Sequence, residues 1–320
     1  MARYFAGNSL ASFNRTNSTI TESTSTGFDS AVVGSSLQVV GGTGADYAES
    51  WAFNASGTLH WMFEFFQNSA TISGVGPALY NGSTGVFRLR NSGATNRIQA
   101  EYWNGSAWTA TGVVFEWTNN VRHRIYVSIT LGSGFTAYLD GGVVTTGSGW
   151  SGGGTTVTNI RMYPLAGNPA TATWYSQIML ADYNVQDSKL FTLAINGNSA
   201  TNTGASSGVY TDINETPLNE STIISIGTAG NKAGFTKASL TVPSGHVIGA
   251  MVINARGRIT GGTADGLIGV RSASTNYSGS GLGYTSSYGP KGRIISDDPA
   301  TGSAFTQTNF NNAEGYLEAS

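Results

Sequence analysis

The stretch FTAYLDGGVV, residues 135–144, alternates apolar and polar residues and then stops at an Asp-Gly-Gly corner before apolar residues resume. Alternation with a period of two predicts a strand that buries one face. Asp-Gly between two such runs favours a tight hairpin, because both residues tolerate positive φ angles. We therefore predict that Asp140 forms a hairpin corner and that its carboxylate accepts hydrogen bonds from nearby backbone N–H groups.

Similar runs recur along the chain, separated by corners of Gly, Asn and Ser, whereas helical periodicity is almost absent. Many short strands with regular turn signals predict an all-β fold of the sandwich or jelly-roll type. The apolar stretch VIGAMVIN (247–254) predicts a central strand covered on both faces. In the runs LHWMFEFF and HRIYVSIT, the residues predicted to point inward are Leu59, Trp61, Phe63, Phe65, Ile125, Val127 and Ile129.

The composition supports an all-β chain of two domains. A length of 320 residues favours about two domains, and charged residues make up only 11%. Gly, Ser, Thr and Asn occupy the positions that Lys and Glu usually fill, as expected of many tight turns. The Asn/Gly/Ser/Thr-rich stretch at 184–209 has the composition of an exposed linker or long loop. We predict a jelly roll over residues 1–190 and a smaller β-sandwich module over residues 191–320.

Charge and cysteine content exclude several function classes. The net charge of -2 argues against a nucleic-acid partner, since no basic face is available to contact phosphates. The chain has no cysteine, which excludes disulfides and thiolate chemistry. No apolar run is long enough to span a membrane, and the first residues lack the apolar core of a secretory signal. We therefore expect neither membrane insertion nor secretion by a signal peptide.

Several segments of the N-terminal part resemble the concanavalin A-like, laminin-G-type jelly rolls. The segments are LHWMFEFF (59–66), RHRIYVSIT (122–130), FTAYLDGG (135–142) and TNIRMYPLAGNPATATWYSQIMLADYNVQ (158–186). The resemblance covers most of residues 30–186 and implies a jelly roll in which the Asp-Gly hairpin is a common corner.

The C-terminal part resembles a β-rich module of structural proteins of tailed bacteriophages. The segments that carry this resemblance are YTDINETPLNESTIISIGTAGNKAGFT (210–236), VIGAMVINARGR (247–258) and SDDPATGSAFTQTNFNNAEGYLEAS (296–320), with Phe305 where such modules often have Trp. The resemblance implies a virion protein assembled in the host bacterial cytoplasm. Its partners would be copies of itself, with a trimer favoured, and other virion proteins.

Two functions follow from these resemblances, and a third is disfavoured. The first is a non-enzymatic structural component displayed on the capsid or tail, for decoration or as part of an appendage. The alternative is an adhesin of a tail or head fibre that binds a receptor or a host surface glycan. A polysaccharide-degrading enzyme on the same fold is the third.

The carboxylates give no catalytic pattern. Retaining glycosidases need two carboxyl groups about 5–5.5 Å apart. Glu64 and Glu116 each stand alone between two aromatic residues, and Asp297 and Asp298 are adjacent, so on a strand they would face opposite ways. We therefore predict no catalytic residue and a protein that is not an enzyme.

The histidines and aspartates give no metal site. His60, His123 and His246 fall in separate segments and are predicted to be exposed strand residues. Asp46 and Asp140 offer too few oxygens for calcium, which takes six to eight. We predict no metal and no cofactor.

Aromatic residues are concentrated in EYWNGSAWTATGVVFEW (101–117). Asn104-Gly105 predicts a hairpin turn, with Trp103 and Trp108 on the flanking strands near its tip. Together with Tyr102 these residues are candidates for contact with a glycan or for a subunit interface. A place in the core or in an interface is favoured, because tryptophan and tyrosine are enriched there.

Overall fold

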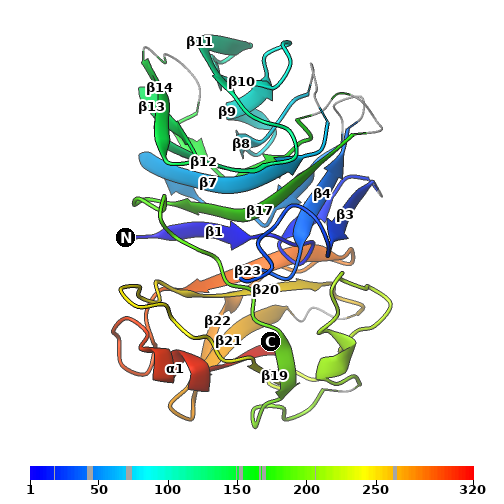
Figure 1. Cartoon of the computed structure of the whole chain (residues 1–320). Helices are drawn as coiled ribbons and strands as arrows, with labels where there is room; N and C mark the ends of the chain where they lie inside the picture. Colours follow the sequence, from blue (N-terminus) through cyan, green and yellow to red (C-terminus); the bar gives the residue numbers. More distant parts are fainter. Residues whose placement is uncertain are drawn as a thin grey trace. The chain divides into compact units, whose positions relative to one another are not determined.

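The structure is a computed structural model, and it describes residues 1–320 except 18, 42–45, 70–73, 149, 151–153, 166, 168–170, 206 and 262–264, as well as the side chains of 112–115 and 144–145. The chain divides into two compact units, Met1–Leu190 and Phe191–Ser320. Strands dominate both units, with one short α-helix, α1 (Gln307–Asn312), and one 3-10 turn, η1 (Tyr210–Asp212), among the described residues (Figure 1). The prediction of an all-β protein is confirmed.

The described residues of the N-terminal unit form two large antiparallel sheets and one short strand pair, β15 (Thr156–Val157) with β6 (Ala55–Ser56). In sheet order the first large sheet contains β14 (Gly142–Ser148), β13 (Gly134–Leu139), β12 (Arg122–Thr130), β7 (Thr58–Gln67), β17 (Ala172–Ala181), β4 (Ser36–Val40) and β3 (Ile20–Ser23), with β1 (Arg3–Gly7) also paired to β17. The second contains β11 (Trp108–Glu116), β10 (Arg97–Trp103), β9 (Thr84–Asn91), β8 (Ala78–Asn81), β16 (Asn159–Met162), β5 (Ala48–Ser50) and β2 (Phe13–Arg15).

The core of this unit lies between the two sheets. Phe135 of β13 packs on Phe87 of β9 with ring centroids 5.1 Å apart, which joins the inner faces of the two sheets. The predicted inward residues are fully buried, which confirms the period-two patterns. These residues are Leu59, Trp61, Phe63, Phe65, Ile125, Val127 and Ile129.

The Asp-Gly corner is a two-residue hairpin turn between β13 and β14, as predicted. Asp140 and Gly141 have φ angles of 50° and 85°, the positive values that match the twist of the flanking strands. The Asp140 carboxylate accepts a hydrogen bond from the Arg124 backbone N–H at 2.7 Å and also contacts His123 Nδ1 at 2.7 Å. His123 points into the sandwich and is buried, so the prediction of an exposed histidine is wrong at this position.

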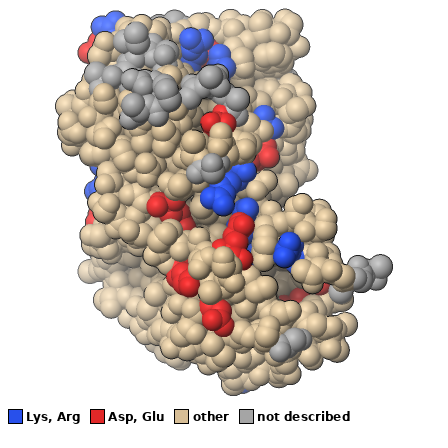
Figure 2. All heavy atoms as spheres, turned by 90° about the vertical axis from the view of Figure 1, so that its right-hand side faces the viewer, with Lys and Arg blue, Asp and Glu red and all other residues tan. Residues whose placement is uncertain are grey.

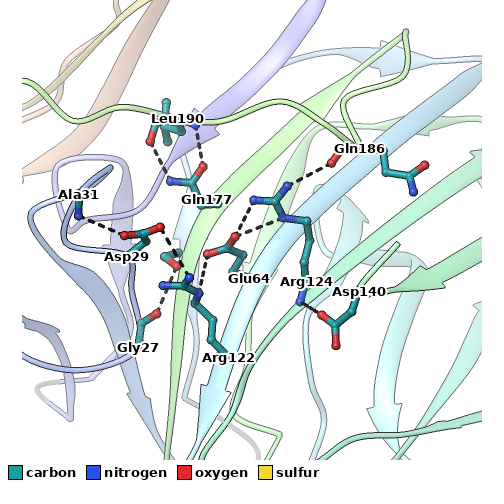
Figure 3. A network of polar contacts seen from close by, with 11 residues as sticks. Gly27, Asp29, Ala31, Glu64, Arg122, Arg124, Asp140, Gln177, Gln186 and Leu190 are labelled. Atoms are coloured by element: carbon teal, nitrogen blue, oxygen red, sulfur yellow. Dashed lines mark hydrogen bonds and ion pairs between the residues drawn. The ribbon is translucent and has the colours of Figure 1, made fainter. Parts of the chain in front are cut away.

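A network of ion pairs covers part of the outer face of the eight-stranded sheet (Figure 3). Glu64 of β7 is almost fully buried and contacts Arg124 at 2.7 Å and Arg122 at 3.4 Å. Arg122 also pairs with Asp29, and Arg124 donates to the Gln186 carbonyl at 3.3 Å. The isolated carboxylate of Glu64 is thus held by two guanidinium groups on the neighbouring strand, a structural role that ties the segment after β17 to the sheet.

The C-terminal unit is a smaller two-layer β-sandwich, as predicted. Its core contains Met251, Val270, Ile295, Phe305 and Phe310, which come from both layers and from the segment around α1. One layer consists of β18 (Ile195–Asn198), β19 (Lys232–Lys237), β24 (Glu314–Ala319), β21 (Gly266–Ser272) and β22 (Thr275–Gly281) in sheet order, and the other of β20 (Met251–Gly257) paired with β23 (Gly289–Ile295). Within the described residues, no helix has the length and apolar character needed to cross a bilayer.

Two local predictions in this part of the chain are wrong. Residues 247–254 are not a central strand, because β20 begins at Met251 and, among the described residues, pairs with β23 alone, while Val247 before it is 87% exposed. The stretch at 184–209 is not simply an exposed linker, because it contributes β18 and buries Ser199 and Thr201. These small polar side chains lie on Gly234, where a Cβ atom would be only 2.1 Å from Thr201 Oγ1. Composition alone therefore mistook close packing of small residues for exposure.

The fully buried carboxylate of Asp298 makes the stability of the C-terminal unit depend on pH. It accepts hydrogen bonds from the Ser272 hydroxyl at 2.6 Å, the Asn309 amide at 2.8 Å and the Ala300 backbone N–H at 3.1 Å. Burial alone would raise the pKa of Asp298, but these bonds outweigh it and lower the pKa below its ordinary value of 3.8. A lowered folded-state pKa contributes stability above the unfolded value, and this stability is lost as the pH falls through that value towards the folded one.

We expect Asp298→Asn to destabilise the C-terminal unit by about 1–3 kcal/mol at neutral pH, because charge-assisted hydrogen bonds are lost. Below about pH 4 the difference in the free energy of unfolding between the variant and the unmodified protein should shrink. The reason is that the ionised Asp298 carboxylate no longer favours the folded state over the unfolded state. Calorimetric unfolding at neutral and acidic pH measures both effects. A variant that is equally destabilised at both pH values would contradict this account.

Candidate functional site

Charged side chains give no obvious site. On the face shown in Figure 2 acidic and basic side chains are few, and they lie near one another instead of forming a patch of one sign. Within the described residues, no three or more His, Asp or Glu side chains are grouped to hold a metal ion. Asp46, considered above as a calcium ligand, accepts a hydrogen bond from the Asn17 amide at 3.0 Å.

The histidines do not come together either. His60 and His123 lie on opposite faces of the eight-stranded sheet. His123 is paired with Phe65, which lies five residues after His60 on β7, and residues an odd number apart along a strand face opposite ways. His60 Nδ1 lies 2.6 Å from the Tyr126 hydroxyl, and burial lowers the pKa of His60. His246 is exposed in a turn that is not part of a strand. The three side chains therefore serve separate local contacts.

The tryptophans single out one place on the surface. Five of the seven are buried, namely Trp51, Trp61, Trp117, Trp150 and Trp174. Trp103 and Trp108 remain partly exposed and lie edge to face, with ring centroids 5.6 Å apart. They are paired in register where β10 ends and β11 begins. The two tryptophans that are not buried, Trp103 and Trp108, are therefore neighbours on the surface.

The turn that carries these two residues is well braced, which confirms the predicted hairpin. The Asn104 side-chain oxygen accepts hydrogen bonds from the backbone N–H groups of Ser106 at 3.0 Å and Ala107 at 2.9 Å. Gly105 has a φ of 102°, which a residue with a side chain rarely adopts. The turn thus fixes the separation of the two strands that present Trp103 and Trp108.

Tyr102 lies apart from this pair. It is opposite Phe87 in the strand register and packs against the buried Trp150, with ring centroids 5.6 Å apart. Successive residues of a strand point to opposite faces, so Tyr102 faces the core while Trp103 faces outward. Of the three candidates from the sequence, the structure brings two together.

Trp108 belongs to a line of alternating rings and guanidinium groups on the outer face of the seven-stranded sheet. Arg88 lies 4.3 Å from the centre of the Trp108 ring, and the Trp108 and Tyr80 rings are 6.2 Å apart. Arg161 lies 4.0 Å from the Tyr80 ring and 4.7 Å from the Tyr47 ring. We call these five residues the aromatic–arginine row. Each guanidinium is held over a ring by cation–π attraction.

Two glutamates neutralise the arginines of the row. Glu101 of β10 accepts a hydrogen bond from Arg88 Nε at 2.7 Å, and Glu49 of β5 accepts one from Arg161 Nε at 2.8 Å. Burial lowers the pKa of Arg88, although Glu101 opposes this shift. Burial also acts to lower the pKa of Arg161, but hydrogen bonds with Glu49 and Tyr163 outweigh it, so the pKa is raised. Both side chains are therefore firmly placed cations.

The row depends on a glycine below it. A Cβ atom on Gly85 would lie 2.3 Å from Cζ2 of Trp108, so the indole ring rests directly on the backbone of β9. Because no side chain intervenes, Trp108 lies flat enough to stack with Arg88 and to contact Tyr80.

We expect Gly85→Ala to displace the Trp108 ring and to destabilise the N-terminal unit by about 1–3 kcal/mol, the usual cost of overpacking. The matched control is Gly34→Ala, because nothing lies within 4 Å of a Cβ atom at Gly34. Urea unfolding followed by tryptophan fluorescence measures the effect. Equal stability of the two variants would show that Trp108 does not rest on Gly85.

The chemistry of this face suits a ligand with both C–H and hydroxyl groups. Exposed indole faces carry a negative quadrupole that attracts C–H groups, and fixed Arg and Glu side chains donate and accept hydrogen bonds. The sequence indicated only the tryptophans. Tyr47, Tyr80, Arg88 and Arg161 lie far apart along the chain, and their convergence depends on sheet order. The weak signal that was available is the pair Arg88 and Arg90 at alternating positions of β9, with a single outward-facing Arg161 on β16.

Comparisons with known proteins identify no family for this chain. No family model and no curated protein matches the sequence. Among solved structures, the globular domain of T. cruzi calreticulin is 11% identical, with a TM-score of 0.44, over 57% of this chain and 89% of that one. An endo-β-1,4-glucuronan lyase from the fungus Trichoderma reesei is 13% identical, with a TM-score of 0.43, over 58% and 98%. The carbohydrate-binding module CBM66 from Bacillus subtilis is 8% identical, with a TM-score of 0.38, over 55% and 98%.

The comparisons correct one prediction. The prediction that the protein is not an enzyme is wrong as an inference from this fold, because the similar structures include a polysaccharide lyase. None of these three structures is a virion protein. The bacteriophage role therefore rests on the sequence resemblance alone.

Proposed function

We propose that the N-terminal unit binds a carbohydrate on the outer face of its seven-stranded sheet, with Trp103 and Trp108 in contact with the sugar. The observation that carries this proposal is the position of the tryptophans. Five are buried and the other two lie side by side on one face, next to fixed guanidinium and carboxylate groups. Exposed aromatic surface is costly in water, and its concentration beside ordered polar groups is typical of a binding site.

A carbohydrate fits these groups better than a purely apolar ligand would. A sugar ring has C–H faces, which pack on indole rings, and a rim of hydroxyl groups, which need donors and acceptors. Arg90, whose side chain is 42% exposed and pairs with Glu101 at 3.5 Å, supplies N–H donors on this face, and the exposed Asn104 side chain at the hairpin tip supplies a further polar group. An apolar partner would leave these charges buried and without solvent, which is unfavourable.

The proposal is tested by electrophoresis of the full chain through gels that contain hydroxyethylcellulose, xylan, polygalacturonate or alginate. We expect at least one polymer to retard the protein, and the double variant Trp103→Ala/Trp108→Ala to migrate freely. Tyr288→Ala is the matched control, because it removes a ring under an arginine, Arg258 at 4.6 Å, in the C-terminal unit. If no polymer retards the protein, or if the double variant is retarded equally, the proposal is wrong. A subunit interface would then be the better explanation of the exposed indoles.

The same incubations are assayed for new reducing ends. Retardation without new ends would identify a binding module, whereas new ends would show that the bound polymer is also cleaved. Both results agree with carbohydrate binding at this face, and the assay separates a binding role from an enzymatic one.

A further inference from the structure

One guanidinium on the outer face of the seven-stranded sheet has no carboxylate of its own. Within the described residues, the ion pairs of this face join four arginines to three glutamates. Arg97 and Arg161 each pair with a separate glutamate, whereas Arg88 and Arg90 share the carboxylate of Glu101. The ion pairs of this face therefore leave one positive charge that its glutamates do not neutralise.

Arg88 and Arg90 share Glu101 unequally. Arg88 Nε donates a hydrogen bond to Glu101 Oε2 at 2.7 Å, and the side chains of both residues are largely buried. Arg90 Nη1 lies 3.5 Å from Glu101 Oε1, which is longer than the roughly 2.7–2.9 Å of a charge-assisted hydrogen bond. The Arg90 side chain is also 42% exposed. Arg88 is therefore the main partner of Glu101, and Arg90 is the guanidinium that a ligand can reach.

Arg90 lies on the same face as Trp103 and extends towards it. Arg90 is opposite Gln99 in the register, and Gln99, Glu101 and Trp103 occupy alternate positions of β10, so these side chains share the outer face. The contact with Glu101 brings the Arg90 guanidinium level with a residue that precedes Trp103 by two positions, a rise of roughly 7 Å. A sugar ring that packs on Trp103 therefore has this cation within reach of its own substituents or of those on the next sugar.

We propose, on the basis of the carbohydrate-binding function above, that the ligand is an acidic polysaccharide and that a uronate carboxylate pairs with Arg90 while a sugar ring packs on Trp103. A guanidinium presents parallel N–H groups that match the two oxygens of a planar carboxylate. Arg90 Nε donates to the Asn91 carbonyl at 3.1 Å, which holds the base of the guanidinium in place. A neutral sugar would gain nothing from the surplus charge, so this charge favours a uronate-containing polymer over a neutral one.

Affinity electrophoresis of the full chain at graded concentrations of polygalacturonate and alginate, each in its native and its methyl-esterified form, tests this inference. We expect at least one native polymer to bind at least roughly tenfold more tightly than its ester, because the ester cannot pair with Arg90 as an anion. Arg90→Gln should bring the two Kd values to within about threefold of each other. The matched control is Arg97→Gln, which removes the same charge from an arginine of this face that is 48% exposed and pairs with Glu116. This control should keep the preference for the native polymer.

The outcomes separate the two proposals. If the native polymers and their esters retard the protein equally, if only neutral polymers retard it, or if Arg90→Gln keeps the preference, the acidic ligand is wrong while carbohydrate binding stands. Equal loss of the preference in Arg97→Gln would show general attraction by charge and would also overturn the role of Arg90. If no polymer of either kind retards the protein, the proposed function itself fails. Arg90→Lys keeps the positive charge and should retain part of the preference, which separates the loss of this charge from a disturbance of β9.

Discussion

Glu101→Ala is expected to lower the free energy of unfolding of the N-terminal unit by about 3–5 kcal/mol, because it leaves the buried guanidinium of Arg88 without its partner. The side chains of Glu101 and Arg88 are 6% and 13% exposed, so water cannot replace the lost carboxylate. All seven tryptophans lie in residues 1–190, and urea unfolding followed by their fluorescence therefore reports on this unit alone.

A neighbouring ion pair provides the matched control. Glu116 of β11 pairs with Arg97 of β10, but their side chains are 67% and 48% exposed. Exposed pairs contribute little, so Glu116→Ala should cost at most about 1 kcal/mol. The double variant Glu101→Leu/Arg88→Met should recover most of the stability lost in Glu101→Ala, since it removes the unpaired charge. Equal stability of Glu101→Ala and Glu116→Ala would contradict the claim that burial makes the Glu101–Arg88 ion pair contribute more to stability than the exposed pair.

Trp103→Ala is expected to weaken binding of a retarding polysaccharide by about 2 kcal/mol, which is roughly 30-fold in Kd. Arg88 lies over the ring of Trp108 and a Cβ atom on Gly85 would touch the same ring, whereas Trp103 stands at the end of β10 and meets Trp108 in an edge-to-face contact. Trp103 is therefore the indole best placed to offer a face to a sugar, and Trp108 the one that positions the row. Affinity electrophoresis at graded polymer concentrations gives the Kd.

Conservative replacement separates contact from folding in this experiment. Trp103→Phe keeps an aromatic face and should retain part of the affinity, while both variants should unfold at urea concentrations close to that of the unmodified protein. Tyr288→Ala should bind normally. An unchanged Kd in Trp103→Ala would remove this residue from the site.

Much of the fold follows from local sequence patterns. Period-two alternation in residues 59–66 and 123–130 identified the residues that face the core, although Met62 and Tyr126 on the opposite faces are buried as well. The Asp140-Gly141 corner was equally clear, since few residue pairs accept two positive φ angles. The contact between Asp140 and His123 could not be predicted, because it depends on which strand lies beside the corner.

The prediction failed where packing depends on distant residues. The apolar run at 247–254 indicated a central strand, yet Val247 is exposed and β20 has one neighbour. Most of the candidate site could not be predicted from the sequence, for a similar reason. The hairpin at Asn104 placed Trp103 and Trp108 together, but Arg161 reaches the same face only through the strand order β16-β8-β9. Strand order is a property of the whole fold, which no local pattern encodes.

The central claim is that the two partly exposed indoles, Trp103 and Trp108, form a carbohydrate site on the outer face of the seven-stranded sheet. It is tested most directly by the NMR signals of the seven tryptophan indole N–H groups during titration with the polysaccharide that retards the protein. We predict that the signals of Trp103 and Trp108 shift and that those of the five buried tryptophans stay in place. Binding that leaves the Trp103 and Trp108 signals unchanged would contradict the account.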